Sequence, residues 1–141
     1  MSDAHRRFHD VVTLHRNRGE IERLSDAILA AAERCGFTKA SRFAIRLAFE
    51  EAVTNAFHHG HAHLPGEPIE VEYEVAPEQV SMSVTDRGPG FRPEDVPDPT
   101  LEENLANPNG RGLMLMRTYM SAVFFNERGN RVTMIYRRPG A

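Results

Sequence analysis

The sequence predicts a two-layer α/β sandwich in which helices cover one face of an antiparallel or mixed sheet. Two observations predict this fold class. Two segments in the first half of the chain have apolar residues at helical spacing, and several later segments alternate between apolar and polar residues. Strands with one polar side need cover on only one face, so helices with their own apolar stripe should pack against the other.

The chain has the size of one domain. Its 141 residues, 40% of them hydrophobic, are enough for one compact core and too few for two ordinary domains. No internal repeat, low-complexity tract or linker interrupts the sequence. Residues 1–141 are therefore predicted to form a single domain.

Charge and hydropathy exclude two classes of partner. The net charge of -3 provides no general basic field to hold a nucleic acid backbone. The longest uninterrupted apolar run, residues 27–32, is far shorter than the roughly 20 residues of a membrane span. Residues 1–10 are polar rather than signal-like. We therefore expect a soluble, unexported, cytoplasmic protein that binds neither nucleic acid nor a membrane.

Two residue types exclude further kinds of site. Cys35 is the single cysteine, so the chain can form neither an internal disulfide nor a cysteine-rich zinc site, and a buried thiol is expected. Lys39 is the single lysine and does not follow a glycine-rich loop. Its position excludes a P-loop and the strand-borne lysine of ordinary protein kinases.

The first half of the chain is predicted to contain one short strand and two helices. A β-prone run lies at residues 11–14. Residues 20–35 have the spacing of an amphipathic helix. A second helix, capped by Thr38 or Ser41, should run to about His59.

The second half is predicted to contain a hairpin, a helix and two further strands. Ile69–Val75 and residues 80–85 alternate with a period of two, residues 112–120 favour a helix, and Ala122–Phe125 and Arg131–Arg137 favour strands. The long segment before this helix is rich in proline and acidic residues and has almost no periodicity. A loop of that length in a compact domain is usually functional or disordered.

Glu51 and Asn55 form the first candidate pair. They are four residues apart, so they project from the same side of the second helix, next to its apolar stripe. A carboxylate there can act as a general base toward a hydroxyl or water, and an amide oxygen can hold a divalent cation. The alternative is a solvated helix pair with a capping role, which this segment taken alone favours.

Two glycine signatures follow. Asp86 directly follows a strand, and Gly88 and Gly90 after it allow a tight turn and close approach by a flat ligand. The Asp86 carboxylate could accept a hydrogen bond from an adenine amino group, although in such a turn aspartate more often bonds its own backbone. Gly110 and Gly112 open a helix whose first amides suit phosphate oxygens, unless they are an ordinary glycine-rich helix start.

Two other interpretations fit less well. A Rossmann fingerprint would need a third glycine where Leu115 stands, and no clear strand precedes it. The clustered histidines lack an ordered spacing and a cysteine partner, so solvated helix-end residues are a better explanation than a structural metal site. These histidines are His58, His59, His61 and His63.

Together these segments resemble the GHKL ATPase superfamily, which includes gyrase, the mismatch-repair ATPases, sensor histidine kinases and anti-sigma-factor serine kinases. EEAVTNAFHHG resembles its N box, DRGPGF its G1 box and NGRGLMLM its G2 box. Their order and separation match too, and the similarity covers about residues 11–137. The small size and the Thr-Asn-Ala sequence in the N box resemble the anti-sigma-factor serine/threonine kinase type.

The resemblance implies the Bergerat fold, whose sheet is mixed and mostly antiparallel, with ATP held under a lid of about residues 92–109. It implies that Glu51 activates a serine hydroxyl on a partner protein, that Asn55 coordinates Mg²⁺, and that Asp86 binds adenine. The other nucleotide-binding residues that it implies are Gly88, Gly90, Gly110, Arg111, Gly112 and Leu113.

The implied function is an ATP-dependent serine/threonine protein kinase that sequesters a sigma factor and phosphorylates an anti-anti-sigma partner of the STAS type. A homodimer is also expected from the resemblance. Relatives often carry an arginine shortly before the first glycine of the G2 box, where this chain has Asn107-Pro108-Asn109, so Arg111 is the candidate to reach the γ-phosphate. Two alternatives stay open, namely a nucleotide-gated binding module without kinase activity and a stand-alone catalytic domain of a two-component histidine kinase.

Overall fold

A single antiparallel sheet forms one layer of the molecule. The computed structural model describes residues 7–60, 64, 66–88 and 108–140, and for residues 59, 60 and 108–113 it describes the backbone alone. Within these ranges the sheet has five strands in the order β1-β2-β3-β5-β4, and every neighbouring pair is antiparallel. The strands are β1 (Phe8–Leu14), β2 (Ile69–Val75), β3 (Gln79–Thr85), β4 (Ala122–Phe125) and β5 (Arg131–Arg137).

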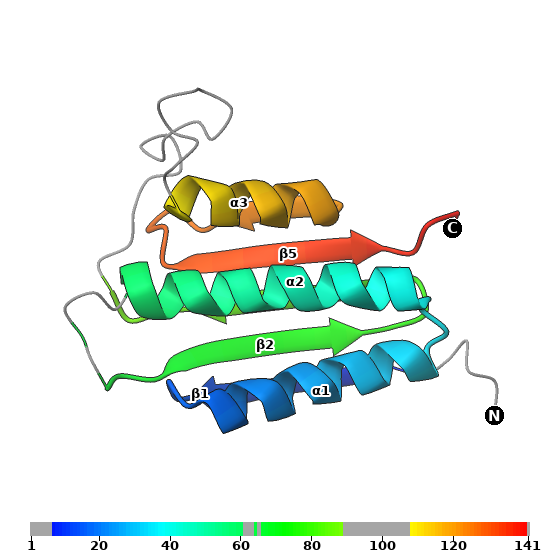
Figure 1. The fold of residues 1–141 in the computed structure, drawn as a ribbon, viewed down its shortest axis with the longest axis horizontal. Coiled ribbons are helices and arrows are strands. Elements are labelled where there is room, and N and C mark those ends of the chain that lie inside the picture. The colour runs from blue at the N-terminus through cyan, green and yellow to red at the C-terminus, as the bar shows by residue number, and fades with distance from the viewer. Residues whose placement is uncertain (1–6, 61–63, 65, 89–107, 141) are drawn as a thin grey trace.

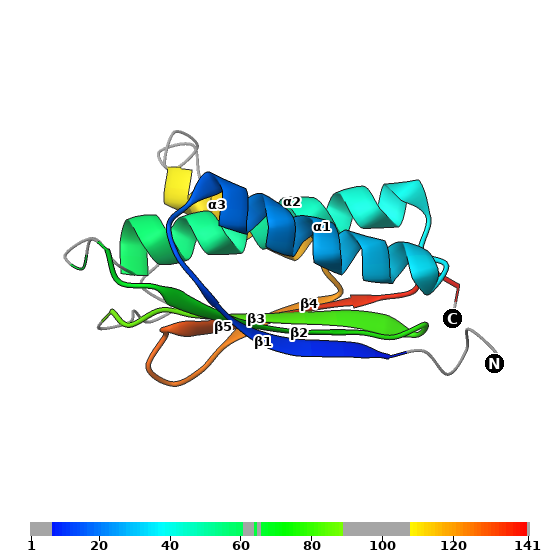
Figure 2. The same ribbon diagram turned by 90° about the horizontal axis from the view of Figure 1, so that it is seen from below.

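Three helices form the second layer. In Figure 2, α1 (Arg18–Arg34), α2 (Lys39–Asn55) and α3 (Pro108–Tyr119) all lie on the same side of the sheet. The largest fully buried side chains come from both layers and include Ile28, Ile45, Phe49, Met116, Val71, Val80, Met82 and Met134. The predicted two-layer α/β sandwich is thereby confirmed. None of the helices in the described ranges has the length and apolar character needed to cross a membrane.

The helix starts follow from capping. The Asn17 side chain accepts a hydrogen bond from the amide of Glu20 at 3.0 Å, so α1 begins at Arg18, two residues before the predicted start. The sequence left Thr38 and Ser41 as alternative caps for α2. Thr38 is the cap, since its side-chain oxygen accepts from the amide of Ser41 at 3.1 Å.

Two further boundaries differ from the sequence prediction. β1 begins at Phe8 rather than at residue 11, because it pairs with β2 over its full length, from Phe8 opposite Val75 to Leu14 opposite Ile69. α3 begins at Pro108 rather than at Gly112. Proline suits the first helical position, where its missing amide hydrogen costs no helical hydrogen bond. Residues 108 and 109 of the predicted lid (about 92–109) therefore belong to α3, and residues 89–107 lie outside the described ranges.

Arg138 connects the C-terminal segment to two distant turns. Its guanidinium donates to the carbonyl oxygens of Cys35 at 2.8 Å, Gly36 at 3.0 Å and Pro77 at 3.3 Å. It also lies over the ring of Phe37, 5.4 Å from the ring centroid, in cation–π geometry. Cys35 is buried, as predicted. This cluster holds the α1–α2 connection and the β2–β3 turn against the end of β5.

Candidate functional site

The predicted site segments meet at one end of the molecule. In Figure 1 the C-terminal end of α2, the end of β3 and the first turn of α3 all lie at the same end of the two-layer body. α2 contacts both α3 and β3. The fold therefore gathers into one region three segments that are separated in the sequence, since Asp86 lies 31 residues after Asn55 and 22 residues before Pro108.

Glu51 and Asn55 lie near the C-terminal end of α2 and are both half-buried. Partial burial raises the pKa of the Glu51 carboxyl above its ordinary value of 4.5, and the neighbouring negative charge of Glu50 raises it further. A raised pKa makes a carboxylate a stronger base for a hydroxyl proton. Glu51 therefore has a raised proton affinity, which is one of the properties that a general base uses.

Asn55 is the last α-helical residue before a change in helix type. The helix continues from Ala56 to Gly60 as a π-helical turn, so the predicted end near His59 and Gly60 is confirmed, although the hydrogen-bond pattern changes on the way. Single π-helical turns occur mostly inside α-helices and are frequent at functional sites. The turn changes the angular relation between Asn55 and the residues that follow it.

Asp86 and Gly88 form a tight turn at the end of β3. The Asp86 carboxylate accepts a hydrogen bond from the Gly88 amide at 2.8 Å, which is the backbone-bonded arrangement that the sequence left open. Asp86 is half-buried and Gly88 is buried. A carboxylate fixed by its own turn at the rim of the core is preorganised to accept a hydrogen bond from a ligand. Gly90 lies outside the described residues.

The β4–β5 turn supports this segment, and sequence reasoning missed its role. Asn130 exchanges two hydrogen bonds with Asp86, accepting from its amide at 2.9 Å and donating through Nδ2 to its carbonyl at 3.1 Å. Arg128 donates to the Gly88 carbonyl at 3.4 Å. The sequence predicts strands on both sides of residues 127–130 but holds no signal for the contact of this turn with a segment more than forty residues earlier.

The glycine-rich G2 segment lies inside α3 rather than before it. The first four amides of a helix have no partner within it. With the helix starting at Pro108, Gly110 lies among those first amides, whereas Gly112 is already in the next turn. The expectation that Gly112 opens the helix was therefore wrong. Arg111 and Leu113 lie in the same first turns, and the description there is of the backbone alone.

The described residues offer few protein ligands for a metal. No group of three or more His, Cys, Asp or Glu within the described ranges is placed to hold a metal ion. His58 is exposed and contacts Arg16, with Arg16 Nη2 and His58 Nε2 3.2 Å apart. Mg²⁺ prefers oxygen ligands and keeps few protein ligands when it is bound with phosphates. The amide oxygen of Asn55 fits that minimal donor set.

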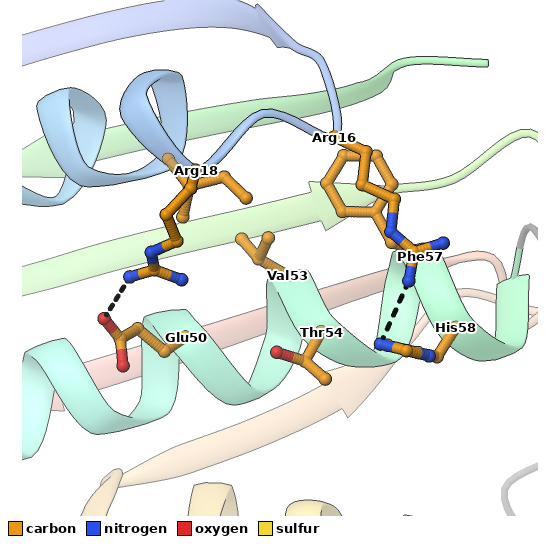
Figure 3. A pocket seen from close by; sticks show the side chains of 8 residues that line it. Arg16, Arg18, Glu50, Val53, Thr54, Phe57 and His58 are labelled. Atoms are coloured by element: carbon orange, nitrogen blue, oxygen red, sulfur yellow. Dashed lines mark hydrogen bonds and ion pairs between the residues drawn. The ribbon is translucent and has the colours of Figure 1, made fainter. Parts of the chain in front are cut away.

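A small hollow lies beside the site on the other side of α2. Figure 3 shows Arg16 and Arg18 reaching from the start of α1 toward α2, where Arg18 pairs with Glu50 at 3.2 Å. The hollow has a volume of about 150 Å³, well below the roughly 300 Å³ or more of a typical ligand pocket. The hollow is therefore too small for a nucleotide, and none of the predicted site residues lines it. Its lining is Arg16, Arg18, Ile21, Glu50, Val53, Thr54, Phe57 and His58.

Comparison with known proteins identifies a family. Residues 16–136 match the family described as the histidine kinase-like ATPase domain, a range that includes the three candidate segments. The chain is 34% identical over 91 residues to the serine/threonine-protein kinase BtrW of Bordetella bronchiseptica, a match that covers 62% of this chain and 63% of BtrW.

Two clostridial proteins are also similar. The anti-sigma F factor of Clostridium botulinum is 31% identical over 102 residues, covering 64% of this chain and 66% of that protein. The anti-sigma F factor of Clostridium beijerinckii is 28% identical over 102 residues, covering 67% of this chain and 68% of that protein. For BtrW and the Clostridium botulinum protein, the matched part is less than two thirds of the relative's length.

Proposed function

This chain belongs to the histidine kinase-like ATPase family, and on that premise we propose that it is an ATP-binding anti-sigma regulator with serine/threonine protein kinase activity. Its protein substrate is an anti-anti-sigma partner of the STAS type, and its second partner is a sigma factor that it sequesters. The observation that carries the proposal is the meeting of the Glu51 helix, the Asp86 turn and the start of α3 at one end of the fold. The printed names of the similar proteins support the choice of partners.

The nucleotide would lie between these three segments. Asp86 would accept a hydrogen bond from the adenine amino group, in a pocket shaped by Gly88 and Gly90. The phosphates would lie at the first amides of α3, whose positive dipole end suits anions. Of the residues that we assign to the phosphate end, Gly110 and Arg111 lie among these first amides, and Gly112 and Leu113 follow in the next turn.

Mg²⁺ held by Asn55 would offset negative charge on the phosphates. Glu51 would accept the proton of the substrate serine hydroxyl as the seryl oxygen forms its bond to the γ-phosphorus. The bond between that phosphorus and the β–γ bridging oxygen breaks, and ADP leaves with the electron pair. The raised pKa of Glu51 supports its assignment as this proton acceptor.

The proposed partners place the protein in the cytoplasm, where sigma factors act. The family resemblance also leads us to propose a homodimer. Analytical ultracentrifugation of the purified chain with and without ATP tests the dimer directly. A single monomeric species in both conditions would contradict it.

The kinase proposal is tested by incubating the full chain with ATP labelled at the γ-phosphate and a STAS-domain protein from the same cells. We expect acid-stable label on a serine, and Glu51→Gln should lower transfer by about 100-fold or more while leaving ATP affinity within a few-fold. Glu33→Gln is the matched control, since Glu33 is an exposed carboxylate on α1. Undiminished transfer by Glu51→Gln would remove Glu51 from this role, and acid-labile label would favour a histidine kinase.

One observation favours a second candidate, a nucleotide-gated binding module that sequesters its partner without phosphorylating it. Pro108 occupies the first position of α3, near where relatives often carry an arginine. An arginine can stabilise charge on a transferring phosphoryl group, and proline cannot. This candidate predicts ATP-dependent capture of the partner with no label on it. Label on the partner after incubation with the unmodified chain separates the two. Where label is found, loss of transfer in Arg111→Ala shows that Arg111 supplies the missing charge.

A further inference from the structure

Two exposed aromatic side chains from different helices meet on the outer surface of the helical layer. Phe43 on α2 is 61% exposed and Tyr119 at the end of α3 is 38% exposed. Their rings contact edge to face, with centroids 6.5 Å apart and planes at 83°. Isolated apolar side chains are common on protein surfaces. A ring contact between two helices instead brings exposed apolar side chains together at one place on the surface, and exposed apolar groups that cluster can mark an interaction site.

The arrangement of the helices creates this patch. In Figure 1, α2 and α3 lie side by side and run in opposite directions, so that the first turns of α2 lie beside the last turns of α3. Leu47, one turn beyond Phe43, is half-buried and continues the apolar surface along α2. We call Phe43, Leu47 and Tyr119 the aromatic patch.

Basic side chains flank the aromatic patch on α2. Lys39 and Arg46 are exposed and lie one turn before and after Phe43, on the same side of the helix. Neither α3 nor α2 before Glu50 contains an acidic residue. Arg46 forms an ion pair with Glu50 at 3.5 Å, but exposed pairs of this spacing are weak and exchange readily. The surface here is positive although the whole chain has a net charge of -3.

We propose that the aromatic patch, with Lys39 and Arg46, is a docking surface for an acidic amphipathic helix of a protein partner. The two rings provide rigid apolar contacts, and aromatic residues are enriched in the parts of interfaces that contribute most to affinity. The flanking cations select an acidic partner and increase its rate of association.

The ring geometry favours a protein over single-stranded nucleic acid. Bases are bound on aromatic faces that stack one after another along a basic groove. Here the two rings are nearly perpendicular, so their faces are not parallel and cannot stack with successive bases. The acidic remainder of the chain would also repel a phosphate backbone.

The docking surface is separate from the proposed nucleotide site. Phe43 precedes Glu51 by eight residues, which is about 12 Å along the helix axis. Loss of docking therefore leaves ATP binding unchanged, and loss of kinase activity leaves docking unchanged. Peptide docking can therefore be tested independently of the proposed kinase activity.

The probe is a synthetic, fluorescein-labelled amphipathic helical peptide with leucines on one face and glutamates beside them. A second peptide has lysine in place of every glutamate. By fluorescence anisotropy with the full chain, we expect the acidic peptide to bind at least about tenfold more tightly than the basic one, and less tightly as salt increases. Phe43→Ser and Tyr119→Ser should each weaken binding about tenfold. Lys39→Glu combined with Arg46→Glu should remove the preference for the acidic peptide.

Matched controls come from the other surfaces. Phe124→Ser changes a ring that is 51% exposed on β4, and Arg34→Glu reverses an exposed charge on α1; neither should change peptide affinity. Unaltered thermal melting and ATP affinity show that each variant is folded.

Four outcomes would overturn the proposal. In the first, the acidic peptide binds no better than the basic peptide, and in the second, Phe43→Ser binds it as tightly as the unmodified chain. In the third, a single-stranded oligouridine binds more tightly than the acidic peptide and competes with it, which would make the surface a nucleic acid site. In the fourth, sedimentation shows that Phe43→Ser dissociates a dimer, which would make the occupant a second copy of this chain.

Discussion

At its N-terminal end α2 is tied to the sheet by a side-chain hydrogen bond, whereas its C-terminal end passes into a π-helical turn. Ser41 is buried and lies 2.6 Å from the Tyr136 hydroxyl of β5, and Thr38 donates to Ser41 at 3.1 Å. At the other end, exposed Arg16 contacts exposed His58. The helix is therefore anchored at the end away from Glu51 and Asn55.

This difference suggests that residues near the two ends of α2 have different roles, one group in stability and the other in ligand binding or catalysis. Residues that hold the anchored end should affect folding and leave ligand binding unchanged. Under the proposed function, polar residues around the open end should instead affect ATP binding or phosphoryl transfer and change stability little, because their polar groups would contact the nucleotide or its substrate. Variants at each end test this separation, and those below are ordered from the largest expected effect to the smallest.

Asp86→Asn should weaken ATP binding by about 100-fold, just under 3 kcal/mol. The amide oxygen can keep the bond from the Gly88 amide, so the turn should persist. The amide nitrogen, however, replaces a carboxylate acceptor and faces the adenine amino group as a donor. Calorimetric titration measures the affinity, and thermal melting should change little. A large fall in melting temperature with unchanged ATP affinity would show that Asp86 stabilises the fold rather than binding ATP. It would contradict the proposed difference between the two ends.

Arg138→Ala should lower the free energy of unfolding by about 2 kcal/mol, because it removes charge-assisted hydrogen bonds to carbonyl oxygens and a cation–π contact. Denaturant unfolding measures the loss, and ATP affinity should stay the same. Arg138→Lys keeps the charge but not the planar set of donors, so it should recover only part of the stability. Equal stability of all three proteins would show that the cluster around Cys35 is not an anchor.

Local patterns explain why most of the fold could be predicted. Alternation in Ile69–Val75 and helical spacing in α1 and α2 record which side chains face the core, and burial follows these patterns closely. The start of α3 could not be predicted in the same way. Glycine disfavours helix interiors, so Gly110 and Gly112 were expected to open the helix, and only the fold shows that Pro108 begins it.

The sequence predicts which residue types form the site, but not the contacts that hold them in place. Glu51, Asn55 and Asp86 could be identified as candidate site residues because each lies within a short sequence motif. Their meeting at one end depends on the fold, and the contact of Asn130 with Asp86 joins segments with no shared local pattern. The π-helical turn after Asn55 also had no signal in the spacing of apolar residues. Non-local contacts of this kind follow from topology alone.

Tyr136→Phe should lower the free energy of unfolding by about 1 kcal/mol, the net value of one partly buried hydrogen bond. The ring would keep its tilted contact with Phe37, whose centroid is 6.1 Å away, so packing should be preserved. Ser41 would then lose its short hydroxyl partner but keep Thr38. Chemical denaturation of the single variants and of the double variant with Ser41→Ala measures the coupling. Additive losses would show that the two hydroxyls do not act together.

Glu51→Gln should slightly stabilise the folded chain at neutral pH, by no more than about 2 °C in melting temperature. Burial and Glu50 raise the pKa of Glu51 above 4.5, so between that value and the raised pKa the folded chain binds more protons than the unfolded chain. Stability therefore falls as pH rises through this interval, and above it the carboxylate destabilises the folded state relative to a neutral amide. The difference between the variant and the unmodified chain should disappear as the pH falls below about 4.5. Melting curves across pH measure it, with Glu33→Gln as the exposed control, and a difference that grows toward low pH would show that the Glu51 carboxylate is stabilised rather than desolvated at the open end of α2.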